Sequence, residues 1–106
     1  MADLEASTFQ KRPCYRYIRE SDKLPTIAAT REVADPIAKV KLFTGSWTWF
    51  IAGYDPETRR AYGLVSGFED ETGDIDMPEL VNIRGQFGLP IERDLYWEPR
   101  PLSECA

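Results

Sequence analysis

The chain contains no histidine and only two cysteines among its 106 residues. Without histidine, the commonest general base and the commonest transition-metal ligand are both missing, so Ser-His-Asp and Cys-His catalysis are excluded. Cys14 and Cys105 lie near opposite ends of the chain. One disulfide is the alternative to two free thiols, and we expect free thiols in a cytoplasmic protein. The sequence indicates no catalytic residue, no metal ligand and no cofactor.

Long apolar runs are absent as well. No run approaches the roughly 20 residues of a membrane-spanning helix, and the N-terminal stretch MADLEASTFQKRP lacks the apolar region of a secretory signal. We therefore expect a cytoplasmic protein with no membrane contact. Hydrophobic residues make up 42% of the chain, which suffices for one core. We expect a flexible N-terminal arm over residues 1–12 and a single α+β domain over residues 13–106.

Positive charge is scarce in the larger part of the chain. The formal net charge is −5. Residues 1–44 hold eight basic and six acidic side chains, whereas residues 45–106 hold five basic and twelve acidic ones. Because phosphates repel carboxylates, direct binding to nucleic acid is disfavoured, and a protein with a basic surface is the better electrostatic match.

The segment over residues 41–68 predicts a β-hairpin. Two runs rich in aromatic and β-branched residues flank Asp55-Pro56-Glu57-Thr58, which suits a type I turn. Alternation places Trp47, Trp49 and Ile51 on one face of the first strand and Thr48, Phe50, Ala52 and Tyr54 on the other. Both faces are apolar, so this strand should be central and covered on both sides. Gly63 and Gly67 in the second run indicate a bulge or close packing under a tryptophan.

Further elements follow from local patterns. Strands are expected over residues 14–18, 37–43 and 95–97, with a turn at Gly45-Ser46. Asp76 is a good N-cap for a helix that would end near Arg84, before Gly85. The predicted fold class is therefore α+β: a small antiparallel sheet of about four to five strands with one or two short helices.

An acidic run follows the hairpin, and we expect a loop over Glu69–Asp74 with Ile75 on a short strand. No basic residue between Arg60 and Arg84 neutralises it. As a calcium loop it fails, because Ile75 and Val81 would stand where the turn glycine and the closing glutamate belong. We expect either a solvated loop or a partner-binding surface, whose residues would be Glu69, Asp70, Glu71, Asp74, Asp76 and Glu79.

Other candidate sites are less specific. Seven aromatic residues are of the kind found at interfaces, although core packing explains most of them: Trp47, Trp49, Tyr54, Tyr62, Phe68, Tyr96 and Trp97. If one face of the sheet is incompletely covered, an aromatic patch would suit a partner or a homo-oligomer. The basic pairs Lys11-Arg12 and Arg59-Arg60 could touch phosphate, but such pairs are common on protein surfaces.

Four segments carry a family resemblance. They are KLFTGSWTWFIAGYDPETR, YGLVSGFE, MPELVNIRGQFGLPIERDLY and WEPRPLSE, and they span about residues 39–104. In order and spacing they resemble the small bacterial proteins grouped as domain of unknown function 2958. The resemblance implies a small α+β domain encoded on plasmids, phages or conjugative elements, and it implies no catalytic residue. The chain departs from the pattern at Thr44-Gly45-Ser46 and at Gly73-Asp74-Ile75-Asp76.

Two hypotheses of different classes follow. The leading one is a non-enzymatic protein-binding accessory protein of a mobile genetic element. It could inhibit a host defence complex, in the manner of an anti-CRISPR or anti-restriction protein, through its acidic surface. The alternative is a small enzyme with a carboxylate-based active site at a buried Asp55 or Glu69 near a tryptophan.

Overall fold

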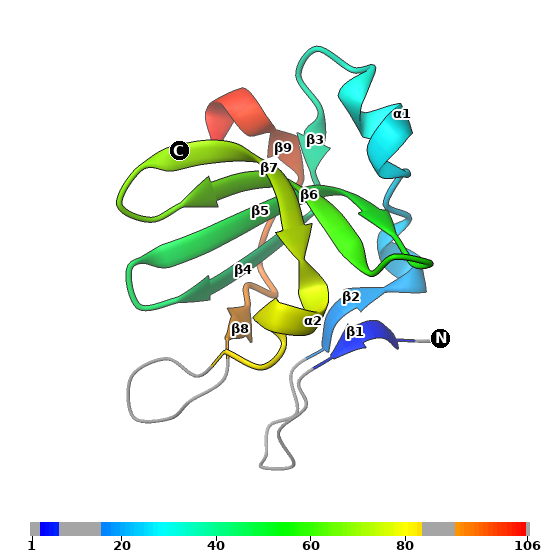
Figure 1. Ribbon diagram of the computed structural model, residues 1–106. Helices are drawn as coiled ribbons and strands as arrows, with labels where there is room; N and C mark the ends of the chain where they lie inside the picture. The colour runs from blue at the N-terminus through cyan, green and yellow to red at the C-terminus, as the bar shows by residue number, and fades with distance from the viewer. Residues whose placement is uncertain (1–2, 7–15, 84–90, 106) are drawn as a thin grey trace.

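The computed structural model describes residues 3–6, 16–83 and 91–105. Its centre is an antiparallel sheet with the strand order β7-β6-β5-β4-β8 (Figure 1). These strands are β4 (Val40–Thr44), β5 (Trp47–Asp55), β6 (Arg60–Ser66), β7 (Asp70–Asp76) and β8 (Glu92–Arg93). Two short helices, α1 (Ile27–Arg31) and α2 (Met77–Leu80), accompany the sheet. The predicted α+β class is confirmed.

Two small antiparallel pairs lie beside the central sheet. One joins β1 (Asp3–Ala6) to β2 (Arg16–Arg19), and the other joins β3 (Ile37–Ala38) to β9 (Arg100–Pro101). A 3₁₀ turn, η1 (Glu20–Asp22), follows β2, and another, η3 (Leu102–Glu104), follows β9. The flexible arm over residues 1–12 stays a prediction; within it, Asp3–Ala6 form β1 and pair with β2. Residues 1–2 and 7–15, which include Cys14, lie outside the described residues.

The predicted hairpin is confirmed as the strand pair β5–β6. Residues 56–59 form its tip, and Arg59 adopts a left-handed φ of 55°. The predicted turn at Gly45-Ser46 is confirmed between β4 and β5, and Gly45 supplies the positive φ of 54° that this two-residue turn requires. β4, β5 and β6 therefore pair with their neighbours in the sequence, which explains why short local patterns identified these three strands.

Both faces of β5 are covered, as predicted. On one face Trp49 and Ile51 join a core built with β2 and α2, and on the other face Phe50 packs with Ala38 and Leu64. The register slips by one residue at Ala52, which is a β-bulge. Past the bulge the alternation reverses, so Tyr54 lies in the same core as Trp49 and Ile51. The prediction that Tyr54 faces the opposite side is wrong for this reason.

Two other predictions change in detail. The strand predicted over residues 95–97 is wrong, because Asp94 starts a turn in which its Oδ1 accepts a hydrogen bond from the Tyr96 backbone N–H. The helix after Asp76 is confirmed but ends at Leu80, before the predicted end near Arg84.

Cys105 is a free thiol, as expected, and burial raises its pKa. No helix in the described ranges has the length and apolarity needed to cross a membrane.

Candidate protein-binding surface

Most of the acidic run belongs to β7, so the loop predicted over Glu69–Asp74 is wrong, whereas the strand predicted at Ile75 is confirmed. β7 pairs with β6 at seven successive positions, from Ser66 opposite Asp70 to Arg60 opposite Asp76. As the last strand in the order, β7 is an edge of the sheet (Figure 1). Pairing along β6 outweighs the weak strand propensity of aspartate and glycine.

The strand geometry separates the six predicted site residues into two groups. In the first group, Asp70 accepts a hydrogen bond from the Ser66 hydroxyl at 2.7 Å, and Asp74 pairs with Arg31 at 2.8 Å. Asp76 caps α2, where it accepts a bond from the Glu79 backbone N–H at 3.5 Å. These three carboxylates have structural roles, although the Ser66 hydroxyl is neutral and leaves the charge of Asp70 without an ion pair among the described residues.

The second group comprises Glu69, Glu71 and Glu79, which are exposed and form no ion pair with any other described residue. Glu69 immediately precedes β7 and Glu71 lies near its start, next to Asp70. A net negative potential therefore remains at the beginning of the edge strand. Of the six predicted site residues, Asp74 is neutralised by an ion pair with Arg31.

An aromatic pair adjoins this negative end. Phe68, 94% exposed, meets Trp47 edge to face at a centroid distance of 5.5 Å. Trp47 in turn stacks on Trp49 at 6.3 Å, so the pair is anchored to the core. A Cβ built on Gly67 would lie 2.3 Å from a ring carbon of Trp47, so only glycine lets the indole pack there without movement. The predicted packing of a glycine under a tryptophan is confirmed.

Large exposed aromatic residues beside carboxylates are suited to binding a protein. Buried aromatic side chains supply much of the free energy of association, and charges at the rim select the partner. We refer to Trp47, Phe68, Glu69, Asp70 and Glu71 as the acidic-aromatic surface. All five residues were candidates from the sequence, but the contact between Trp47 and Phe68 was not predictable from it.

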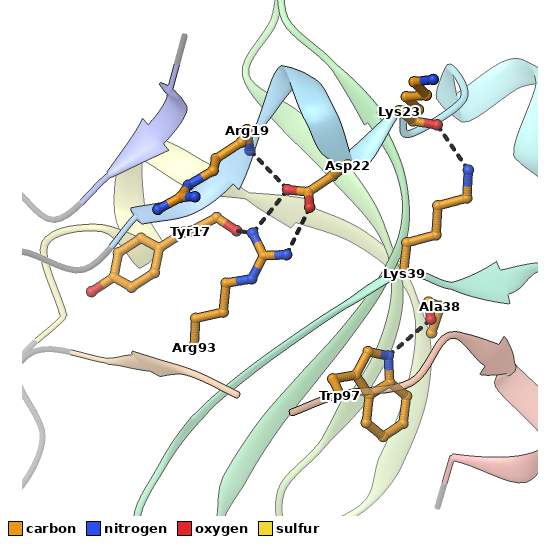
Figure 2. Close-up of polar contacts among 8 residues, drawn as sticks. All are labelled: Tyr17, Arg19, Asp22, Lys23, Ala38, Lys39, Arg93 and Trp97. Carbon is orange, nitrogen blue, oxygen red and sulfur yellow. Dashed lines mark hydrogen bonds and ion pairs between the residues drawn. The ribbon is translucent and has the colours of Figure 1, made fainter. Parts of the chain in front are cut away.

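A second region contains a small cavity of about 190 Å³ beside η1 and β8. Figure 2 shows the Arg93 guanidinium directed at Asp22, with contacts of 2.8 and 2.7 Å, and at the Tyr17 carbonyl, at 3.1 Å. Lys39 reaches the Lys23 carbonyl at 2.9 Å. These groups satisfy one another, so the cavity has the features of a structural junction between β2, η1 and β8.

Trp97 closes the same region. Its indole N–H donates to the Ala38 carbonyl at 2.9 Å (Figure 2), and its ring packs against Phe50. Arg100 lies 4.4 Å and Lys41 5.5 Å from the ring centroid, so cations cover the indole. This ring therefore serves packing, as was expected for most of the aromatic residues.

Sequence reasoning missed a buried carboxylate. The Glu5 side chain is fully buried, and its oxygens accept hydrogen bonds from Tyr54 Oη at 2.5 Å and from Arg59 Nη2 at 2.7 Å. Burial, followed by the bond to Glu5, raises the pKa of Tyr54. Hydrogen bonding to Glu5 raises the pKa of Arg59. No local pattern marks Glu5, because its partners lie about fifty positions along the chain.

The residues proposed for carboxylate chemistry have other surroundings. Asp55 accepts a hydrogen bond from the Ile27 backbone N–H at 3.0 Å, and neither it nor Glu69 lines the cavity described above. In the described part of the chain no group of three or more cysteine, aspartate or glutamate side chains is placed to hold a metal ion. The enzymatic alternative stays a prediction.

Comparison with known proteins gives one result. The profile of a family described as protein of unknown function (DUF2958) matches residues 18–106. No curated protein and no solved structure matches the chain. The match covers most of the sequence, so this chain belongs to the DUF2958 family, and the resemblance inferred from its four segments is confirmed.

Proposed function

We propose that this member of the DUF2958 family is a non-enzymatic binding protein, and that the acidic-aromatic surface docks on a basic surface of another protein. The exposure of Phe68 against Trp47, at the start of a carboxylate-bearing edge strand, carries the proposal. A phenylalanine left 94% in water is a costly arrangement for a monomer and a useful one for an interface.

Electrostatics favours a partner that itself binds nucleic acid. Such a protein presents lysine and arginine side chains that match Glu69, Asp70 and Glu71. The family resemblance suggests an origin on a mobile genetic element. The partner class we favour is therefore a host defence complex of the restriction or CRISPR type, whose nucleic-acid-binding surface the protein would occupy. Its location would be the cytoplasm.

The first experiment identifies the partner. The tagged protein is used for affinity capture from its host, with mass spectrometry of the co-purifying proteins. The candidate is then purified, and its affinity is measured by isothermal titration calorimetry at several salt concentrations. Wild-type affinity should fall as salt rises, because opposite charges across an interface are screened.

Charge reversal then tests the surface. The triple variant Glu69→Lys, Asp70→Lys, Glu71→Lys should bind at least about tenfold more weakly. A matched triple, Glu20→Lys, Glu57→Lys, Glu98→Lys, changes the net charge equally at exposed positions outside this surface and should bind like the wild type. Equal affinities for the two triples would reject the proposal, as would an unchanged affinity for Phe68→Ala.

A further inference from the structure

The outer edge of β7 carries no strand within the described part of the chain. β7 runs unbroken beside β6 for seven residue pairs, and no register slip interrupts it. On its other side the strand order ends. The backbone N–H and C=O groups that point outward along such an edge can pair with an added strand.

A groove begins at this edge. A cavity of about 440 Å³ extends from Thr72 on β7 over Tyr62 and Leu64 on β6, and Val33 and Leu102 form its far wall. Arg31 also lines this cavity, where it lies 5.3 Å from the centroid of the Tyr62 ring and pairs with Asp74. The volume is large enough for a side chain of a bound segment.

Alternation along the sheet directs side chains into the groove. Thr72 lies opposite Leu64 and shares its face, whereas Ile75 is buried in the core on the other face. A strand paired with β7 would continue this alternation, so every second side chain would point to the groove side. Backbone pairing with a pocket for alternate side chains is how known peptide-binding domains take up an added strand.

The negative charge at the start of β7 indicates which side chains an added strand should carry. Glu69, Asp70 and Glu71 at the start of the edge repel a second copy of β7, as charged edge strands generally do. Glu71 lies on the face opposite Thr72, so it attracts the lysine or arginine side chains that alternate with those in the groove. The groove is lined by polar and apolar side chains, and its apolar part, with Leu64, Val33 and Leu102, fits an apolar side chain.

We infer that the partner contributes an extended segment with alternating basic and apolar residues, which adds to the open edge of β7 and places an apolar side chain in the groove beside Thr72. This inference rests on the proposed function and specifies its mode of binding.

Synthetic peptides test the mode of binding. The probe is an end-blocked heptapeptide of alternating lysine and leucine, titrated into the full chain by calorimetry. Two isomers each carry three backbone N-methyl groups, one on residues 2, 4 and 6 of the peptide and the other on residues 3, 5 and 7. In an extended strand these positions point to opposite edges, so each isomer blocks one edge and keeps the charge. If β7 takes up a strand, one isomer should bind at least about tenfold more weakly than the other.

Two outcomes would overturn the inference. The first is equal binding of both isomers, which means attraction by charge alone and leaves the proposed function intact. The second is no binding of the parent peptide, in which case charge reversal against the captured partner still tests the proposed function separately. As a check on the groove, Thr72→Trp should weaken the parent peptide about tenfold by filling the space beside the edge. Thr58→Trp, at the exposed hairpin tip, should not.

Discussion

Gly63 and Gly73 lie directly opposite each other on β6 and β7, yet only one of the two positions has room for a side chain. A Cβ built on Gly63 would lie 1.8 Å from the Phe50 carbonyl oxygen, which belongs to the backbone of β5. A Cβ built on Gly73 would meet no atom within 4 Å. β5 and β6 are therefore packed through a glycine, whereas the edge strand is open.

This asymmetry predicts the effect of alanine at each position. Gly63→Ala should lower the free energy of unfolding by at least about 2 kcal/mol, because β5 or β6 must shift to relieve the overlap. Gly73→Ala should change it by less than about 1 kcal/mol and can stabilise the protein by restricting the unfolded chain. Urea unfolding of the two variants measures both values. Equal losses in the two variants would contradict the packing described for Gly63.

The buried carboxylate of Glu5 gives a second prediction. Glu5→Gln keeps the shape but removes the charge that Arg59 and Tyr54 share. The variant should therefore lower the free energy of unfolding by about 2 kcal/mol, which is the size expected for a charge-assisted hydrogen bond. Glu57→Gln at the exposed hairpin tip is the matched control and should stay within about 0.5 kcal/mol of the wild type. A loss no larger than that of the control would show that the charge of Glu5 contributes little to stability.

The raised pKa of Tyr54 predicts a change of stability in alkali. Below the unfolded-state pKa of about 10, both the folded and the unfolded chain hold the phenolic proton, and this group adds no pH dependence. Above it, the unfolded chain releases the proton while folded Tyr54 retains it, because burial and Glu5 raise its pKa. The free energy of unfolding should then fall by up to about 1.4 kcal/mol per pH unit from this group.

Tyr54→Phe isolates that contribution. The difference in free energy of unfolding between wild type and Tyr54→Phe should stay constant from pH 7 to 9 and shrink as the pH rises above about 10. Urea unfolding at each pH gives the difference. A difference that does not change across this range would mean that Tyr54 ionises equally in the folded and unfolded chains.

Local sequence patterns sufficed where the partners are close in the chain. The β5–β6 hairpin joins neighbouring segments, and Gly45 and Asp76 perform the turn and capping roles that their residue types favour. These elements and the fold class were predictable because each depends on contacts a few residues apart.

Long-range contacts decided the rest. The acidic run lacks strand propensity, and it became β7 because β6 offered an edge to pair with. The bulge at Ala52 reversed the face of Tyr54, and only that reversal brings its hydroxyl to Glu5. The contact between Trp47 and Phe68 likewise depends on how two hairpin ends meet. None of these relationships is encoded in a window of neighbouring residues.

The pair Asp22–Arg93 provides the last prediction. It joins η1 to β8 across 71 positions of the chain, and both side chains are mostly buried. The planar guanidinium makes two parallel bonds to the carboxylate and a third to the Tyr17 carbonyl (Figure 2). A lysine ammonium cannot reproduce this fork.

Arg93→Lys should therefore lower the free energy of unfolding by about 1–2 kcal/mol although the charge is kept. Arg60→Lys, at an exposed position with no ion pair among the described residues, is the control and should be neutral. Removing both partners with Asp22→Ala and Arg93→Met should cost less than the sum of the single changes, because neither charge is then left buried alone. Urea unfolding of the wild type, the two single variants and the double variant completes the cycle. Strict additivity would mean that the two side chains do not stabilise each other, and the junction would then depend on backbone contacts alone.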